Sequence, residues 1–415
     1  MEEISPTIPG IMFLKYLHFR RSSHSCQAQI QHALYQNNPA DIQCPHCKSK
    51  NYYLHGFCYR VALLANHENT LRHVRIQVQR YRCRDCGKTY VMGCEKIGLR
   101  KYQRRNEHCN KLMLKACVEG QTNKCIAERY GVCQSTVEHQ LHRTAQKLVK
   151  QQINYPLPRV LGIDEHKIHK GGKYAITLVD LAHHRVYDVI QTKSKKVLEH
   201  YLRAKKGRMQ VQVVCMDLCP MFRSVVTRLL PQARIVADRF HVIRLINKAL
   251  HDYIKALAPE QRWKRGYTHL LGKRRENLTN KQKERLDELL DMDSSFKLAY
   301  DFKQRLCSLL NLKSLTKQAC RKPLRELTQM LDDLRNTAHL IWRRLADTLS
   351  KWFVPIICMW RFTRSNGITE GFHRKMKFIQ RRAYGFRNFQ NYRLRVLLEC
   401  SHLFIKKRSF HKNLG

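Results

Sequence analysis

The chain has 415 residues, and 78 Lys or Arg against 32 Asp or Glu give it a formal net charge of +46. A length of this order predicts about two to four domains, and a hydrophobic fraction of 43% excludes wholesale disorder. A compact protein with such a positive excess needs a polyanionic partner, and nucleic acid is favoured over anionic membrane or acidic protein.

The beginning of the chain carries no recognisable membrane or export signal. The apolar run at residues 11–14 is too short for a span, and Glu2 and Glu3 stand where a signal peptide has basic residues. We therefore expect a cytoplasmic protein with no membrane partner. In that compartment the 17 cysteines predict metal ligands and reduced thiols rather than disulfides.

Two C-x-x-C motifs follow an N-terminal segment, residues 1–43, that carries little signal. Cys44-Pro-His-Cys47 and Cys83-Arg-Asp-Cys86 each place two thiols on one tight turn. Four thiolates are a common ligand set of structural zinc, and residues 75–81 between the motifs have a strand pattern. We therefore predict a zinc ribbon with an extended hairpin over residues 44–100.

Other interpretations of these cysteines stay open from the sequence. The alternatives are four unrelated reduced cysteines or a redox C-x-x-C pair, although no thioredoxin-like βαβ pattern surrounds either motif. Cys58 and His46 are competing ligands for the same metal.

A helix-turn-helix is predicted within residues 101–152. Residues 123–130 have a short helical pattern, Gly131 supplies a turn, and Ser135-Thr-Val-Glu138 predicts a capping box that opens a second helix. The second helix would enter the major groove of DNA. Four of its side chains would lie near base edges: Gln134, Ser135, Thr136 and His139. An ordinary helical hairpin is the alternative.

Strand and helix patterns alternate through residues 159–256, after a linker in which Pro156 and Pro158 disfavour a helix. The predicted order is βββαβαβ, which indicates a mixed sheet with helices packed on it. The strands are expected at residues 160–164, 174–179, 185–190, 211–217 and 234–238.

The strands at residues 160–164 and 211–217 end in the acids Asp164 and Asp217. Cleaving a phosphodiester requires stabilisation of both the attacking and the leaving oxygen, which two Mg²⁺ ions about 4 Å apart provide. Carboxylates are the hard oxygen ligands that such ions need. A single acid at a strand end is nevertheless more often a solvated surface group. The pattern alone does not choose among the other acids nearby, which are Glu165, Asp180, Asp188 and Asp238.

Several motifs of the core occur together in one known family. They are Gly162-Ile-Asp164-Glu165, the strand ending Met216-Asp217, Asp238-Arg-Phe-His-Val-Ile-Arg-Leu-Ile-Asn247, Ser365-Asn-Gly-Ile-Thr-Glu-Gly371 and Arg382-Ala-Tyr-Gly-Phe-Arg-Asn-Phe389. These segments resemble the DDE transposases of the ISL-three family of bacterial insertion sequences. The resemblance runs from Cys44 to about Leu398 and includes the order zinc ribbon, helix-turn-helix and catalytic core.

The resemblance implies a multidomain protein whose α/β core is RNase H-like and is interrupted by an all-α insertion. The first part of the core would be residues 159–256, the insertion 257–355 and the second part 356–402, with a basic tail at 403–415. The resemblance makes three residues the catalytic acids and magnesium ligands: Asp164, Asp217 and Glu370. Asp238 and His241 match a D-x-x-H element of related transposases and are candidate accessory residues.

The residues around Glu370 agree with this assignment. Asn366 and Thr369 offer caps near a helix start, which would put Glu370 in or near a first helical turn. The basic residues at +4, +7 and +11 from Glu370 share one helical face, which we expect to contact DNA phosphates. They are Arg374, Lys377 and Arg381. A solvated basic face is the alternative.

We therefore predict a transposase that binds the terminal inverted repeats of an insertion sequence and catalyses DNA cleavage and strand transfer. It would use two Mg²⁺ or Mn²⁺ ions and one structural Zn²⁺, and its partners would be the double-stranded DNA of the element ends and of the target. A homodimer or higher oligomer is expected because two ends must meet, and a bacterial, nucleoid-associated location follows. The alternatives are a catalytically inactive DNA-binding regulator derived from a transposase and a nuclease that cuts without joining.

Overall fold

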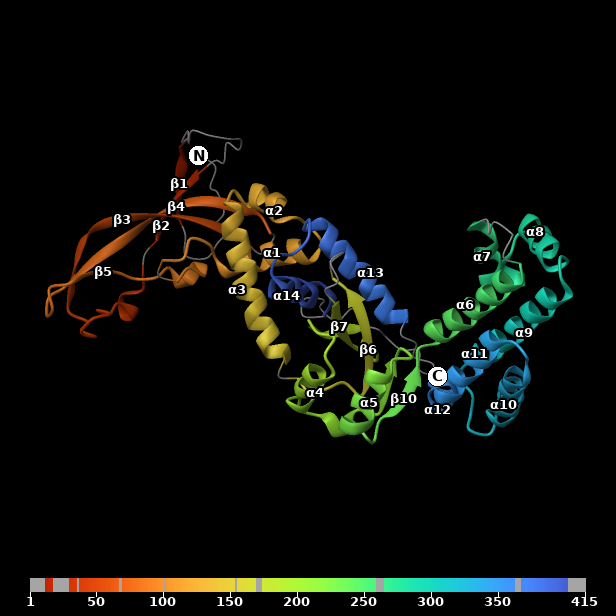
Figure 1. Cartoon of the computed structure of the whole chain (residues 1–415). Coiled ribbons are helices and arrows are strands. Elements are labelled where there is room, and N and C mark those ends of the chain that lie inside the picture. The colour runs from red at the N-terminus through yellow and green to blue at the C-terminus, as the bar shows by residue number, and fades with distance from the viewer. Residues whose placement is uncertain are drawn as a thin grey trace. The chain divides into compact units, whose positions relative to one another are not determined.

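The computed structural model describes residues 12–17, 30–35, 37–66, 69–100, 102–153, 155–168, 174–258, 265–362 and 367–401. They fall into two compact units that divide between Lys147 and Leu148, and each unit is described by itself (Figure 1). None of the helices in these ranges combines the length and the apolar character that a membrane crossing requires.

The first unit contains a five-stranded sheet built on a long hairpin. Strands β3 (Tyr52–Ala65) and β4 (Leu71–Cys83) pair antiparallel, as the extended hairpin between the cysteine motifs predicts. Strand β5 (Thr89–Val91), which follows the second cysteine motif, pairs antiparallel with the end of β4. Strands β1 (Met12–Leu17) and β2 (Ile30–Tyr35) extend the sheet, and β2 runs parallel to β4. Residues 1–43 had no predicted element, because a short strand that pairs with a distant partner leaves no local signal.

Three helices follow the hairpin: α1 (Glu107–Val118), α2 (Asn123–Tyr130) and α3 (Gln134–Ile153). The helix α2 ends as predicted at Gly131, whose φ of 56° is left-handed, and a Cβ there would lie 3.0 Å from Nε2 of His73. The predicted capping box is wrong. The helix begins before Ser135, because the Val137 N–H already bonds to the carbonyl of Cys133.

A buried asparagine joins the hairpin to these helices. The Asn106 carboxamide accepts from the backbone N–H of Ala65 at 3.2 Å and of Cys109 at 3.0 Å, and it donates to the Ala65 carbonyl at 2.9 Å. One side chain thus caps α1 and terminates β3. The ribbon segment and the helix-turn-helix segment therefore belong to one unit.

The second unit contains a five-stranded mixed sheet in the order β10-β9-β6-β7-β8. The βββαβαβ order predicted for it is confirmed, with these strand bounds: β6 (Val160–Lys167), β7 (Tyr174–Asp180), β8 (Arg185–Ile190), β9 (Val213–Met216) and β10 (Arg234–Ala237). Strands β6, β9 and β10 are parallel to one another, whereas β7 and β8 form an antiparallel meander with β6. Strand β6 continues past Asp164, because it still pairs with β7 after its parallel partner β9 has ended.

Helices cover this sheet. The helices α4 (Lys195–Arg203) and α5 (Pro220–Leu229) bury their apolar residues in the main core, together with Leu161, Ile163 and Met216 of the strands. Val179 and Cys215, which alternate with those positions, pack against Phe372 of α13 (Gly367–Arg382). The helix α14 (Phe389–Cys400) contacts β8. The face that α13 covers is therefore also the face of Asp164.

A helical stretch lies between β10 and α13 in sequence, as predicted. Its elements are α6 (Arg239–Leu257), α7 (Arg265–Gly272), α8 (Asn280–Leu290), α9 (Ser294–Leu310), α10 (Arg321–Asn336), α11 (Leu340–Lys351) and α12 (Phe353–Arg361). Leu286, Leu289 and Leu290 of α8 are buried. The helix α12 packs against β10 and also contacts α9 and α11, so it ties the helical stretch to the sheet (Figure 1).

A buried ion pair fixes α14 on the sheet and gives a test of this packing. Asp188 of β8 is 1% exposed, and Arg393 of α14 donates to its carboxylate at 2.6 and 2.8 Å. Replacing Arg393 by Ala should lower the free energy of unfolding by about 3–5 kcal/mol, because it leaves a buried carboxylate without its cation. Urea unfolding measures the loss.

The control for this prediction is Lys248→Ala, which removes an exposed i,i+4 partner of Asp252 on α6. That change should alter the free energy of unfolding by less than about 0.5 kcal/mol. Equal effects of the two substitutions would contradict the role assigned to Arg393.

Candidate active site

The two cysteine motifs converge in the first unit. Sγ of Cys44 lies 3.6 Å from Sγ of Cys86, Sγ of Cys47 lies 3.5 Å from Sγ of Cys83, and all four sulfurs lie within 4.8 Å of one another. Tetrahedral zinc with bonds of about 2.3 Å separates its sulfurs by about 3.8 Å. The four thiols thus have the spacing of a zinc site. Neither Cys58 nor His46 belongs to the cluster.

The two motifs adopt the same turn. In each turn the first cysteine accepts a backbone hydrogen bond from the residue four positions on, Lys48 or Gly87, at 2.9 and 3.1 Å. That residue is left-handed in both turns, with φ of 64° and 68°. The repeated geometry brings all four thiols to one centre, which is compatible with a zinc ribbon.

Sheet register brings three acids together in the second unit. Ile163 of β6 and Ala237 of β10 both pair with Met216 of β9, the strand between them. The next position along each of the three parallel chains is an aspartate. Asp164, Asp217 and Asp238 therefore follow the same rung of the sheet, although Asp217 and Asp238 lie just beyond their strands. These three aspartates are called the acid cluster below.

His241 lies between two of these acids. Its Nδ1 is 2.9 Å from Oδ1 of Asp217 and 2.7 Å from Oδ2 of Asp238. Burial by itself would lower the pKa of His241, but the close contacts with the two aspartates and their negative charges outweigh it and raise that pKa to about 10. The ring is thus an imidazolium that neutralises part of the acid cluster. Asp238 and His241, the two candidate accessory residues, thus lie beside Asp217.

The acid cluster has features of a cation site. The Nδ1 hydrogen of His241 bonds to Asp238, so the buried Oδ1 of Asp217 has no hydrogen-bond partner among the described residues. Burial, followed by the charge of Asp217, raises the pKa of Asp164 to about 8. Carboxylates crowded in this way are both ionised only if a positive charge compensates them. The donor set fits a divalent metal.

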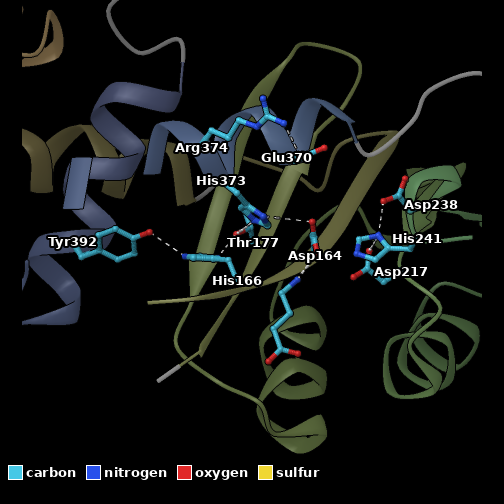
Figure 2. A network of polar contacts seen from close by, with 11 residues as sticks. Asp164, His166, Thr177, Asp217, Asp238, His241, Glu370, His373, Arg374 and Tyr392 are labelled. Atoms are coloured by element: carbon cyan, nitrogen blue, oxygen red, sulfur yellow. Dashed lines mark hydrogen bonds and ion pairs between the residues drawn. The ribbon is translucent and has the colours of Figure 1, made fainter. Parts of the chain in front are cut away.

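Glu370 lies in the first turn of α13, as predicted. Its carboxylate accepts from Arg374 at 2.8 Å, and it is not part of the three-residue cluster that Asp217, Asp238 and His241 form. Figure 2 shows the Glu370–Arg374 pair on the helix that also carries His373. The basic residues predicted to line this helix, Arg374, Lys377 and Arg381, are all exposed.

The competing acids of the core have structural partners. Asp180 accepts from the backbone N–H groups of Ala182 and His183 and pairs with Arg185, so it holds the turn between β7 and β8. Asp188 is held by Arg393, as described above. Glu165 points to the opposite face of β6 from Asp164, 3.6 Å from Nζ of Lys193. Among these competitors, Asp238 is the one that lies in the acid cluster.

Four further side chains of this site were missed from the sequence. They form a buried chain of contacts that ends at Asp164: Tyr392, His166, Thr177 and His373 (Figure 2). Burial lowers the pKa of His166 to about 3 and that of His373 to about 4, so both rings are neutral. Two signals were available. His166 stands two residues after Asp164 on the same strand, and His373 stands one helical turn after Glu370.

The four candidate base-reading side chains lie on the first two turns of α3. Gln134, Ser135 and His139 are exposed, and Thr136 is half-buried because its hydroxyl lies 2.9 Å from Sγ of Cys133. Val137, between them, is fully buried and anchors the helix. The exposed face of this helix is therefore free for contact with DNA, as a recognition helix requires.

Acids gathered on one rung of a mixed sheet, beside a helix with a further acid and exposed cations, make an arrangement suited to metal-dependent phosphoryl transfer. A family model described as "Transposase", that of the ISL-three DDE transposases, matches residues 161–396. The chain belongs to this family and is therefore a DNA-cleaving transposase, an enzyme class that uses divalent metal. It is 24% identical over 358 residues to the transposase for insertion sequence element IS1001 of Bordetella parapertussis, covering 80% of this chain and 84% of that protein.

Proposed function

We propose that this transposase cuts the ends of an insertion sequence and joins them to target DNA, using Asp164, Asp217 and Glu370 as its catalytic acids on an RNase H-like core. The observation that carries the proposal is the convergence of Asp164 and Asp217 on adjacent parallel strands beneath the helix of Glu370. Resemblance to the IS1001 transposase supports the same function.

Each acid has a role that follows from its position. Asp164 and Asp217 would hold divalent ions, Mg²⁺ or Mn²⁺, from the sheet, and Glu370 would complete the ligand set from α13. When bound, the ions supply charge stabilisation for the attacking and leaving oxygens of a phosphodiester. Arg374 pairs with Glu370 in the structure, so a cation lies next to that carboxylate. Asp238 and His241 would orient Asp217 through the contacts described above.

The first unit would supply the recognition of DNA. The zinc-bound ribbon over residues 44–100 would hold α1, α2 and α3 in place through Asn106, and α3 would enter the major groove at the terminal inverted repeats. Arg374, Lys377 and Arg381 of α13 would contact phosphates next to the acid cluster. Two element ends must be brought together, so the active species would be a homodimer or a higher oligomer.

The test of the proposed function is an assay on labelled DNA that carries the element's own ends, with and without Mg²⁺ or Mn²⁺. Metal-dependent cleavage followed by joined products supports it. Cleavage without joining would instead identify a nuclease, and binding without cleavage would identify a DNA-binding regulator.

Sequence recognition by α3 gives a separate expected result. Replacing His139 by Ala should weaken binding to the element end roughly 10- to 100-fold, because a side chain near base edges is lost, and should change binding to unrelated DNA little. Fluorescence anisotropy with both duplexes measures the two affinities. The control is Gln146→Ala, an exposed neutral position two turns further along the same helix. An equal loss on both duplexes would exclude base readout by His139.

A further inference from the structure

We infer that Tyr392, His166, Thr177 and His373 form a directional hydrogen-bond chain that positions the Asp164 carboxylate against the helix of Glu370. The inference rests on the proposed function, because Asp164 and Glu370 are taken as metal ligands. The four members are positioning residues, since none of them belongs to the acid cluster itself.

The hydrogen-bond chain consists of three buried hydrogen bonds and one longer polar contact, which joins it to Asp164. Tyr392 Oη lies 3.0 Å from Nε2 of His166, and Nδ1 of His166 lies 2.9 Å from Oγ1 of Thr177. The Thr177 hydroxyl lies 3.0 Å from Nε2 of His373, whose Nδ1 lies 3.5 Å from Oδ2 of Asp164. Thr177 and Tyr392 are fully buried, and the His373 side chain is 12% exposed. Figure 2 shows Asp164 with His373 on one side and with Asp217 and Asp238 on the opposite side.

The Asp164 carboxylate, at one end of the hydrogen-bond chain, determines the direction of each hydrogen bond. When it holds a metal ion, the Asp164 carboxylate would be ionised and could only accept hydrogen bonds, so His373 would present its N–H at Nδ1 and leave Nε2 as an acceptor. The Thr177 hydroxyl then donates to His373 and accepts from Nδ1–H of His166. Nε2 of His166 is in turn an acceptor, and the Tyr392 hydroxyl donates to it. Each histidine and the threonine thus donate one bond and accept one, so a single set of tautomers satisfies the whole chain.

The hydrogen-bond chain links residues that come before the helical stretch to residues that come after it. His166 and Thr177 come from β6 and β7, before the helical stretch, whereas His373 and Tyr392 come from α13 and α14, after it. Thr177 also stands directly opposite Asp164 in the β6–β7 register. The hydrogen-bond chain therefore fixes the position of α13 relative to Asp164. It also fixes Glu370, which lies one turn from His373 on that helix. Partners behind a ligand commonly set the affinity of a metal site in this way.

The test removes one hydroxyl without changing the volume of the core. Thr177→Val keeps the shape and the strand preference of the side chain but breaks the chain at its centre. It should weaken Mn²⁺ binding by the full-length protein roughly 10- to 100-fold, measured from the free-ion EPR signal, and raise the Mn²⁺ concentration needed for cleavage by a similar factor. Thr177→Ser restores the hydroxyl and should restore most of the affinity. Thr348→Val, which removes a hydrogen-bonded hydroxyl of α11, is the matched control and should leave Mn²⁺ binding unchanged.

A second pair of variants tests the contact between His373 and Asp164. His373→Asn keeps an N–H donor close to the position of Nδ1, so it should retain more Mn²⁺ affinity than His373→Leu. Native Mn²⁺ affinity in Thr177→Val, or failure of Thr177→Ser to restore it, would overturn the inference while leaving the proposed function intact. Undiminished cleavage by Asp164→Asn would instead remove the proposed role of Asp164, whatever the Thr177 variants show.

Discussion

Asp217→Asn should abolish metal-dependent cleavage of element-end DNA while leaving the binding of that DNA intact. The amide keeps the shape of the side chain but removes the charge of a carboxylate whose buried Oδ1 has no hydrogen-bond partner among the described residues. Losing several kcal/mol of charge stabilisation corresponds to a rate decrease of roughly 10³-fold or more. Cleavage rates on labelled ends, with binding measured by anisotropy, separate the two effects.

The same assay distinguishes the acids from one another. Asp164→Asn and Glu370→Gln should lose cleavage to a similar extent, whereas Asp347→Asn, an exposed acid of α11, should cut at the native rate. Asp238→Asn belongs in the same series, because Asp238 lies beside Asp217 whereas Glu370 pairs with Arg374. If Glu370→Gln still cuts and Asp238→Asn does not, Asp238 is the third catalytic acid.

Cys83→Ser should release the zinc and unfold the ribbon. The four sulfurs lie at the centre of two equivalent turns, and a small apolar cluster around Tyr81 and Tyr90 packs beside them. Structural zinc contributes an apparent ~10–16 kcal/mol in small zinc domains, so the loss of one thiolate should outweigh what that cluster stabilises. Zinc content should fall from about one ion per chain towards none. Limited proteolysis should then cut within residues 44–100.

The matched control is Cys58→Ser, a half-buried thiol on β3 of the same hairpin that lies outside the four-sulfur cluster. It should keep its zinc and its resistance to protease. Zinc that persists in Cys83→Ser, or that is lost equally from Cys58→Ser, would contradict the four-cysteine assignment. Because Asn106 joins β3 to α1, Cys83→Ser should also weaken binding to the element end.

Local patterns predicted much of the fold. The strands at residues 174–179 and 185–190, the turn at Gly131 and the start of the helix of Glu370 are found within a residue or so of their predicted places. Each depends on apolar periodicity or on a residue with a restricted conformation, which the sequence shows directly. The β1 and β2 strands were missed because their pairing depends on β4, far along the chain.

The candidate site was predicted in part. Asp164 and Asp217 were candidates because an acid at the end of an apolar strand is visible in the sequence, and the family resemblance then selected them together with Glu370. The structural partners of Asp180 and Asp188 come from side chains in distant elements or in the adjoining turn, which the sequence pattern does not show. The membership of Asp238 in the acid cluster required the β9–β10 register.

The sequence by itself determined the class of this protein, because charge, cysteine spacing and short motifs are properties of local residue order. Only the tertiary structure decided which side chains act together. Tyr392 and His166 are separated by 226 positions along the chain, yet their polar atoms lie 3.0 Å apart. A hydrogen bond depends on distances of a few tenths of an ångström and on the tautomer of each ring, and those are fixed only when β6, β7, α13 and α14 pack against one another.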